Sequence, residues 1–198
     1  MIGVGAFKRH TRMLVNMSDG FIENRNVWIK CSYNKARNDY IKTRDNITDS
    51  VVFHFDSDCD VADGDVLLLS GARYLISSLV PDTFFTLVMR KRAAGVFLNQ
   101  VGNLYSAITS YDSTEGESAS LTLKSSDVWF AMQREPFDGT RHTTLPYDAL
   151  NILMSSNHGV QLGDVLDADI GRYYISGIDR KIPGISRILC STDGREYI

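Results

Sequence analysis

The feature that most constrains this chain is an internal repeat. Gly64–Leu79 and Gly163–Ile178 share eight of sixteen residues without a gap, 99 positions apart. The shared residues are Gly-Asp-Val-Leu, then Arg-Tyr, then Ile-Ser. A second landmark lies upstream in the same order, because Trp28 precedes the first copy by 36 residues and Trp129 precedes the second by 34. Two landmarks at matched spacing indicate that the chain is built from two copies of one unit.

The repeated segment has the pattern of a β-hairpin. The apolar run Val66–Leu69 is too short for a helix and is bounded by turn residues. Ser70-Gly71-Ala72 supplies the turn, where glycine adopts a positive φ at no steric cost. From Tyr74 to Leu79 the side chains then alternate between two faces, as a strand requires. In the second copy, Tyr173-Tyr174-Ile175 opens the return strand in the same way.

Further strands surround each hairpin. The segments with strand alternation or short apolar runs are Asn26–Tyr33, Val51–Phe55 and Phe84–Arg90 in the first copy, and Asp127–Gln133, Leu150–Met154 and Ser186–Ser191 in the second. At least five strands per copy predict an all-β chain with two tandem small β-barrels or sandwiches, SH3-like or related. We expect Trp28 and Trp129 to be the aromatic anchors of the two cores.

The domain boundaries follow from the repeat. We expect an N-terminal barrel over residues 1–95, a connecting segment over 96–121, and a C-terminal barrel over 122–198. The stretch Tyr111–Ser120 is polar, acidic and rich in small residues, as a linker is. Ahead of the first tryptophan strand, Arg12–Met17 and Phe21-Ile22 predict a leading hairpin with its turn at Ser18-Asp19-Gly20.

Composition excludes several classes of protein. The net charge of −3 gives no overall basic field for nucleic-acid binding. No apolar run reaches the ~20 residues of a membrane helix, so no membrane association is expected. The cysteines Cys31, Cys59 and Cys190 follow no metal-ligand spacing and favour a reducing compartment. The acidic stretch Asp56–Asp65 lacks the calcium-loop spacing, and we interpret it as a solvated turn.

No catalytic signature is present. The chain has no nucleophile elbow, no phosphate-binding glycine loop and no His-Glu-x-x-His motif. Its four histidines are scattered, and a pairing of His142 with Cys31 or Cys190 stays open at the level of sequence. We therefore expect a protein that is not an enzyme and that holds no metal or cofactor.

Two long connections are locally basic in this acidic chain. They are Asn34–Asn46 and the equivalent Arg134–Pro146, and connections of this length between strands are uncommon unless they are functional. The candidate residues for contact with DNA phosphates or a neighbouring subunit are Lys35, Arg37, Lys42, Arg44, Arg134 and Arg141. The alternative interpretation is a solvated loop of mixed charge.

The repeated hairpin resembles the central hairpin of the head–tail joining proteins of tailed bacteriophages. The matching residues are Gly64, Asp65, Val66, Arg73, Tyr74 and Ile76, and again Gly163, Asp164, Val165, Arg172, Tyr173 and Ile175. Proteins of that family are small β-barrels with long loops. The resemblance implies a homo-oligomeric ring in the virion, assembled in the host cytoplasm, that joins a portal or adaptor protein to tail proteins and touches packaged DNA without reading its sequence.

Two other functions remain open from the sequence. One is a tail or baseplate adaptor that uses the same barrel. The other, from a different class, is a cellular small-barrel module that binds nucleic acid or peptide. A nucleic-acid module should present a basic face studded with aromatic residues, whereas a ring subunit should present surfaces that bury against copies of itself.

Overall fold

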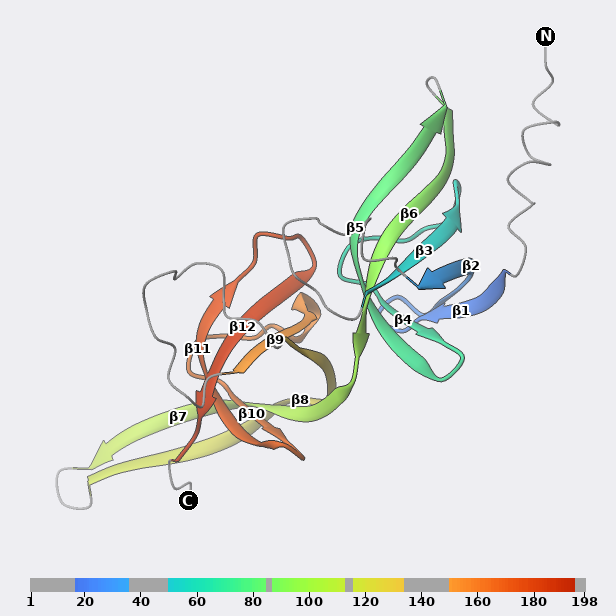
Figure 1. Cartoon of the computed structure of the whole chain (residues 1–198). Coiled ribbons are helices and arrows are strands. Elements are labelled where there is room, and N and C mark those ends of the chain that lie inside the picture. The colour runs from blue at the N-terminus through green and yellow to red at the C-terminus, as the bar shows by residue number, and fades with distance from the viewer. Residues whose placement is uncertain (1–16, 36–49, 85–86, 113–115, 134–149, 195–198) are drawn as a thin grey trace, which may run out of the picture. The chain divides into compact units, whose positions relative to one another are not determined.

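Each copy of the repeat folds into a closed six-stranded antiparallel β-barrel in the computed structural model (Figure 1). The structure describes residues 17–35, 50–84, 87–112, 116–133 and 150–194. One barrel lies in the unit Met1–Phe97 and the other in the unit Leu98–Ile198. The expected all-β fold with two tandem small barrels is confirmed.

The first barrel closes by pairing its first strand with its fourth. Its strands are β1 (Ser18–Ile22), β2 (Val27–Lys35), β3 (Ser50–Asp56), β4 (Val66–Leu69), β5 (Ala72–Phe84) and β6 (Leu87–Leu98). Around the barrel they follow the order β1-β2-β3-β6-β5-β4. Closure places Phe21 opposite Leu68 and Ile22 opposite Leu67.

The second barrel repeats this path strand for strand. Its strands are β7 (Gln100–Asp112), β8 (Gly116–Gln133), β9 (Leu150–Ser155), β10 (Val165–Ala168), β11 (Gly171–Asp179) and β12 (Ile185–Thr192), with a short 3-10 turn η1 (Ser156–His158) after β9. They follow the order β7-β8-β9-β12-β11-β10, and β7 pairs with β10 to close the barrel. The shared topology is what a duplication predicts.

Backbone conformations repeat at the sequence landmarks as well. Gly64 and Gly163 have φ angles of 86° and 85°. Before the two tryptophans, Asn26 and Asp127 also have positive φ angles, of 56° and 51°. Because few residues other than glycine adopt this region, the coincidence is specific. The two copies therefore share the conformation of their turns, and not only a hydrophobic pattern.

The interiors of the two barrels carry different residues at one pair of corresponding positions. In the first, the buried Phe53 ring lies on β3 beside Gly95 of β6. In the second, Ile152 stands 99 positions after Phe53, and Cys190 stands opposite Leu150 as Gly95 stands opposite Val51. A large residue beside glycine is thus replaced by two residues of intermediate size.

The expected role of the tryptophans as core anchors is wrong for Trp28. Its side chain is 72% exposed, while the buried face of β2 carries Ile29 and Cys31. Trp129 is half-buried, and its neighbours Val128 and Phe130 enter the core instead. Residues alternate between the faces of a strand, so a buried Ile29 requires Trp28 to point outward.

Three expected boundaries also need correction. Ser18-Asp19-Gly20 is part of β1 and not a turn, and Arg12–Met17 lies almost wholly outside the described residues. The expected closing strand Phe84–Arg90 spans the end of β5 and the start of β6. The expected connecting segment 96–121 is mostly strand, occupied by the end of β6, by β7 and by the start of β8.

Two hairpins continue beyond their barrels as two-stranded ribbons. In the first unit the ribbon is formed by β5 and β6, and in the second by β7 and β8 (Figure 1). The second ribbon pairs continuously from Tyr105↔Leu123 to Asp112↔Gly116. None of the described residues belongs to a helix long and apolar enough to cross a membrane.

Candidate functional site

The two basic connections expected from the sequence lie almost entirely outside the described residues. Lys35 is the last residue of β2 and pairs with Val51 at the start of β3. Arg37, Lys42 and Arg44, and likewise Arg134 and Arg141, fall in the segments 36–49 and 134–149, which the structure does not describe. Their contact with DNA or a partner stays a prediction.

The Gly-Asp pair of each repeat has an architectural role. Asp65 is buried, and its Oδ2 accepts a hydrogen bond from the backbone N–H of Ala62 at 2.7 Å and pairs with the Arg25 guanidinium at 2.5 Å. Its other oxygen accepts from the Asn24 side chain at 3.1 Å. A buried carboxylate needs such partners. Asp65 therefore ties the β1–β2 turn to the loop before β4.

The second copy has the same buried aspartate, paired with a lysine side chain in place of an arginine. Asp164 is buried, accepts from the backbone N–H of Gln161 at 2.8 Å, and pairs with the Lys124 ammonium at 2.8 Å. Both aspartates are thus explained by loop anchoring. Among the described residues, no group of histidine, cysteine, aspartate and glutamate side chains is placed to hold a metal ion.

The buried thiols are not poised for nucleophilic chemistry. Burial raises the pKa of both Cys31 and Cys190 to about 12, so each remains a protonated thiol near neutral pH. His158 lies within 3.1 Å of the Ser125 hydroxyl through its Nδ1, and burial lowers the pKa of this imidazole. The hydrogen bond between these two side chains links η1 to β8 and is a structural contact.

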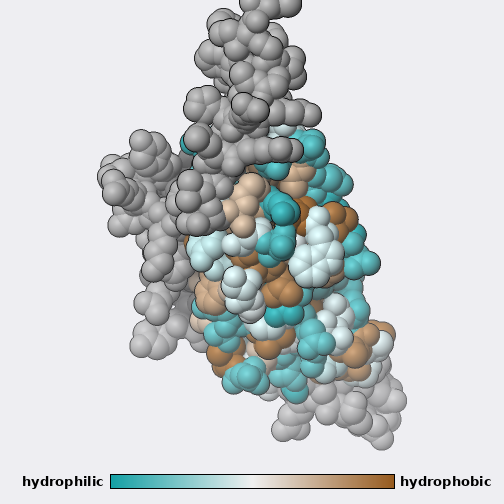
Figure 2. Space-filling model, turned by 90° about the vertical axis from the view of Figure 1, so that its right-hand side faces the viewer, coloured by the Kyte–Doolittle hydropathy of each residue, from teal (hydrophilic) through white to brown (hydrophobic). Residues whose placement is uncertain are grey.

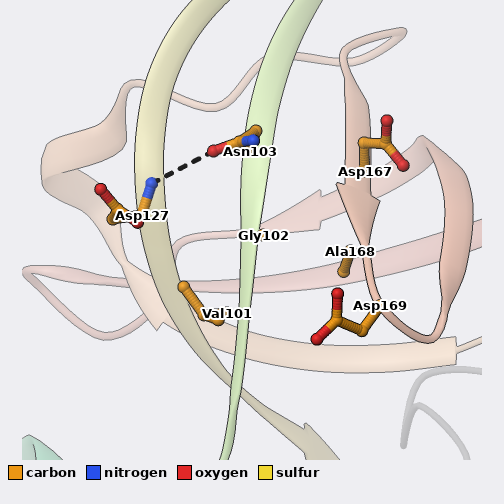
Figure 3. Close-up of a pocket in the computed structure, with 7 residues that line it drawn as sticks. All are labelled: Val101, Gly102, Asn103, Asp127, Asp167, Ala168 and Asp169. Atoms are coloured by element: carbon orange, nitrogen blue, oxygen red, sulfur yellow. Dashed lines mark hydrogen bonds between the residues drawn. The ribbon is translucent and has the colours of Figure 1, made fainter.

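An open pocket of about 310 Å³ lies on the second barrel where β7, β8 and β10 meet (Figure 3). It carries three carboxylates, of Asp127, Asp167 and Asp169. Asp127 stands on one side of β7 and the other two on the opposite side, so the three do not converge on one point (Figure 3). Asp167 also pairs with Arg172 at 3.1 Å. The pocket is acidic but lacks a defined ligand geometry.

One end of the first barrel is lined by aromatic rings, which we call the aromatic mouth: Tyr33, Tyr74 and Phe97 above the buried Phe53. The ring centroids of Tyr33 and Phe53 are 6.2 Å apart, those of Phe53 and Tyr74 5.2 Å, and those of Tyr74 and Phe97 5.7 Å. Burial, with a smaller effect of Tyr33, raises the pKa of Tyr74. This is the end at which β2 stops and β3 starts.

The large apolar side chain with the highest exposure among the described residues, that of Trp28, lies on the outside of the first barrel. Leu68, Phe21 and Trp28 are opposite one another on three neighbouring strands, and we call them the Trp28 surface. The rings of Phe21 and Trp28 are 5.1 Å apart between centroids and tilted by 49°. Phe21 and Leu68 are half-buried, whereas Trp28 is exposed to solvent.

The charges next to the Trp28 surface are paired. Lys30 and Asp19 follow Trp28 and Phe21 on the same face of β2 and β1, 3.9 Å apart. On the other side, Arg73 and Glu23 form an ion pair at 2.9 Å. Hydrophobic and hydrophilic residues are interspersed on the face seen in Figure 2. A row of apolar side chains surrounded by ion-paired polar residues is typical of a protein–protein contact.

Comparisons with known proteins do not add to this picture. No family model matches the chain, and neither the curated proteins nor the solved structures gave a match.

Sequence reasoning missed the Trp28 surface, although the signal was present. Val27, Ile29 and Cys31 alternate with Trp28 and Lys30, and a face that carries lysine is the solvent face of a strand. The alternation alone therefore placed Trp28 outside the barrel. The aromatic mouth left no such signal, because it depends on which strands pair.

Proposed function

We propose that this protein is a structural virion protein of the bacteriophage neck, a head-closure ring subunit that joins the portal to the tail and helps to retain packaged DNA. The resemblance of its repeated hairpin to head–tail joining proteins supports the proposal, as does its construction from small closed barrels. The observation that carries it is the Trp28 surface.

A solvent-exposed tryptophan does not stabilise the closed barrel that carries it, so its role is in contact with another molecule. A tryptophan side chain buries roughly 200 Å² when covered, and at about 25 cal/mol per Å² a partner that covers the exposed part of Trp28 gains about 3–4 kcal/mol. Tryptophan is also over-represented among the residues that dominate protein interfaces. The paired charges at its rim favour a neutral protein partner over a polyanion.

In a ring, each subunit presents one surface to its neighbour on one side and a different surface on the other. The Trp28 surface provides one of these two. The basic connections Asn34–Asn46 and Arg134–Pro146 are then available for the DNA channel, where phosphate contacts hold DNA without reading its sequence.

Two measurements test the proposal. Electron microscopy of the purified full chain should show closed rings, and gold-labelled antibodies against the protein should mark tailed particles at the junction of head and tail. Trp28→Ala should abolish the rings, whereas Val80→Ala, a control at an exposed apolar residue outside the Trp28 surface, should keep them. Labelling at the tail tip or baseplate would favour the tail adaptor, and absence of label from particles would refute both.

The aromatic mouth favours a second candidate, a small-barrel module that binds nucleic acid. Exposed aromatic rings stack on bases with about 1–3 kcal/mol per base. Tyr33 and Phe97 are partly exposed at this end of the barrel, close to where the basic connection begins. A single-stranded oligonucleotide should then quench tyrosine fluorescence, and Tyr33→Ala should weaken binding by about tenfold. Absence of binding at low salt would exclude this function.

A further inference from the structure

The geometry of the second barrel points to a surface for self-association at its projecting ribbon. We propose that this ribbon, the β7–β8 arm (residues 106–112 and 116–123), pairs along its β8 edge with the same arm of a second copy, forming a continuous four-stranded sheet. The inference deepens the proposed function by naming a part that joins copies, and it rests on that function for the choice of a second copy as partner.

The arm is an addition to the repeat. In the first barrel, Ile22 at the end of β1 and Val27 at the start of β2 are joined by a short turn. In the second, the corresponding Leu104 and Val128 are joined by the whole arm. Since the first barrel closes without an arm, the arm is not needed for closure, and its role lies outside its own barrel.

The arm has free backbone edges among the described residues. Pairing of β7 with β10 ends at Tyr105, and pairing of β8 with β9 begins only at Phe130. Along the arm, β7 and β8 therefore pair only with each other. A two-stranded ribbon is marginally stable in water, and its unpaired N–H and C=O groups accept a further strand.

The arm also lacks the residues that normally protect such an edge. Proteins block free edges with proline, lysine or bulges. Residues 106–112 and 116–123 contain no proline, lysine or arginine, and two apolar side chains, Ile108 and Leu123, are 58% and 56% exposed. The ribbon of the first unit differs, because Pro81 on β5 removes a backbone donor there. The unprotected edge is thus specific to the second unit.

Among the described residues, a second copy of the arm fits this edge better than the walls of the two barrels do. Both barrels are closed, so their walls offer no free strand to an incoming edge. Two identical β8 edges are complementary to each other when they run antiparallel about a two-fold axis. In that arrangement the tip of one β8 lies beside the base of the other.

The test uses charge at the centre of the paired edges. Ser120 is exposed and lies near the middle of the β8 side of the arm, so the two copies of this residue lie close to each other about the two-fold axis. Ser120→Lys alone and Ser120→Glu alone should each weaken self-association about tenfold in sedimentation velocity, and an equal mixture of the two should restore it. Leu162→Lys and Leu162→Glu, at a residue 67% exposed in the same unit, are the matched controls and should change nothing.

A second variant removes the arm without removing the barrel. Replacing Tyr105–Ser126 with Glu-Asn-Arg copies the turn Glu23–Arg25 of the first barrel, including an arginine to pair with Asp164. This variant should have the same melting temperature as the intact chain and should lose the self-association that the arm provides. Amide hydrogen exchange of β8 in the intact chain should slow as protein concentration rises.

The outcomes separate the arm from the proposed ring. If rings form and neither the Ser120 variants nor removal of the arm weakens association, the arm inference is overturned while the ring stands. If the intact chain stays monomeric and β8 exchanges at the same rate at every concentration, the arm inference fails, and antibody labelling of particles still decides the proposed function.

Discussion

Replacing Gly95 with alanine places a methyl group where the Phe53 ring already lies. A Cβ atom at position 95 would stand 2.3 Å from Cε2 and 2.7 Å from Cδ2 of that ring. Phe53 is fully buried and packs against Phe55 and Tyr74, with centroids 6.1 Å and 5.2 Å away, so a shift of its ring disturbs both neighbours. Overpacking of this kind costs about 1–3 kcal/mol, and the ~0.5–1 kcal/mol that alanine gains over glycine in a strand offsets only part of it.

Calorimetry of the full chain measures this cost. The two effects leave a net cost of about 0.5–2 kcal/mol. For a unit of this size each kcal/mol lowers the melting temperature by about 4–8 °C, so Gly95→Ala should lower that of the first unit by about 2–16 °C. Gly194→Ala is the matched control, because a Cβ there meets no atom within 4 Å. A shift for Gly95→Ala no larger than that of the control would refute the packing argument.

The second barrel supplies the compensating change. There the position of Phe53 is occupied by Ile152, and Cys190 takes the place of Gly95. Phe53→Ile in the Gly95→Ala background should therefore recover stability, and the double variant should lose less than the sum of the single losses by more than about 0.5 kcal/mol. Strictly additive losses would mean that the two positions do not share one volume.

Three further outcomes follow from the structure. Trp28→Ala should change the unfolding free energy by no more than about 0.5 kcal/mol, as at a surface position, whereas Phe130→Ala should cost about 3–5 kcal/mol in denaturant titration. Asp164→Asn should lower the melting temperature of the second unit through a loss of about 1–3 kcal/mol, because the Lys124 ammonium loses its partner; an unchanged melting temperature would contradict the anchoring role. Because burial lowers the pKa of His158, the unfolded chain binds the proton more readily than the folded one. The stabilising contribution of His158 is thus complete above pH 6.5 and is lost as the pH falls below that value. His158→Gln should therefore flatten this part of the curve of unfolding free energy against pH.

The central hairpin and the tryptophan-bearing strand of each unit could be predicted because the sequence contains them twice. A single Gly-Asp pair is weak information, but Gly64 and Gly163 at matched distance from two tryptophans fix the register of the repeat. The structure shows why these residues stayed the same in both copies. Each glycine needs a positive φ, and each following aspartate is a buried anchor for its loop.

The extent of β7 and β8 could not be predicted, for a physical reason. A ribbon that projects into solvent has no core face, so its residues need not alternate between apolar and polar. Tyr111–Ser120 therefore has the small, polar composition of a linker although most of it is paired strand. Strand pairing is set by backbone hydrogen bonds, which leave no mark on composition when neither face is buried.

The position of Trp28 was predicted wrongly for the opposite reason. The alternation of residues in the sequence indicated the outer face, but the prediction followed residue type instead. Large aromatic residues are often core residues, but the alternation of Ile29 and Cys31 with Trp28 assigns the ring to the outer face. Periodicity is the stronger argument, because the geometry of a strand allows no exception at a single position without a bulge. Applied to every strand, it would have placed the Trp28 surface outside the barrel before the fold was known.

Duplication also gives a way to separate fold from function in this chain. Two barrels that close along the same path need the same turns and anchors, so residues shared by both copies report on folding. Features found in one copy are not required for closure, and they are the exposed Trp28, the aromatic mouth and the β7–β8 arm. Closure of the barrel therefore does not account for the exposed Trp28 or for the arm.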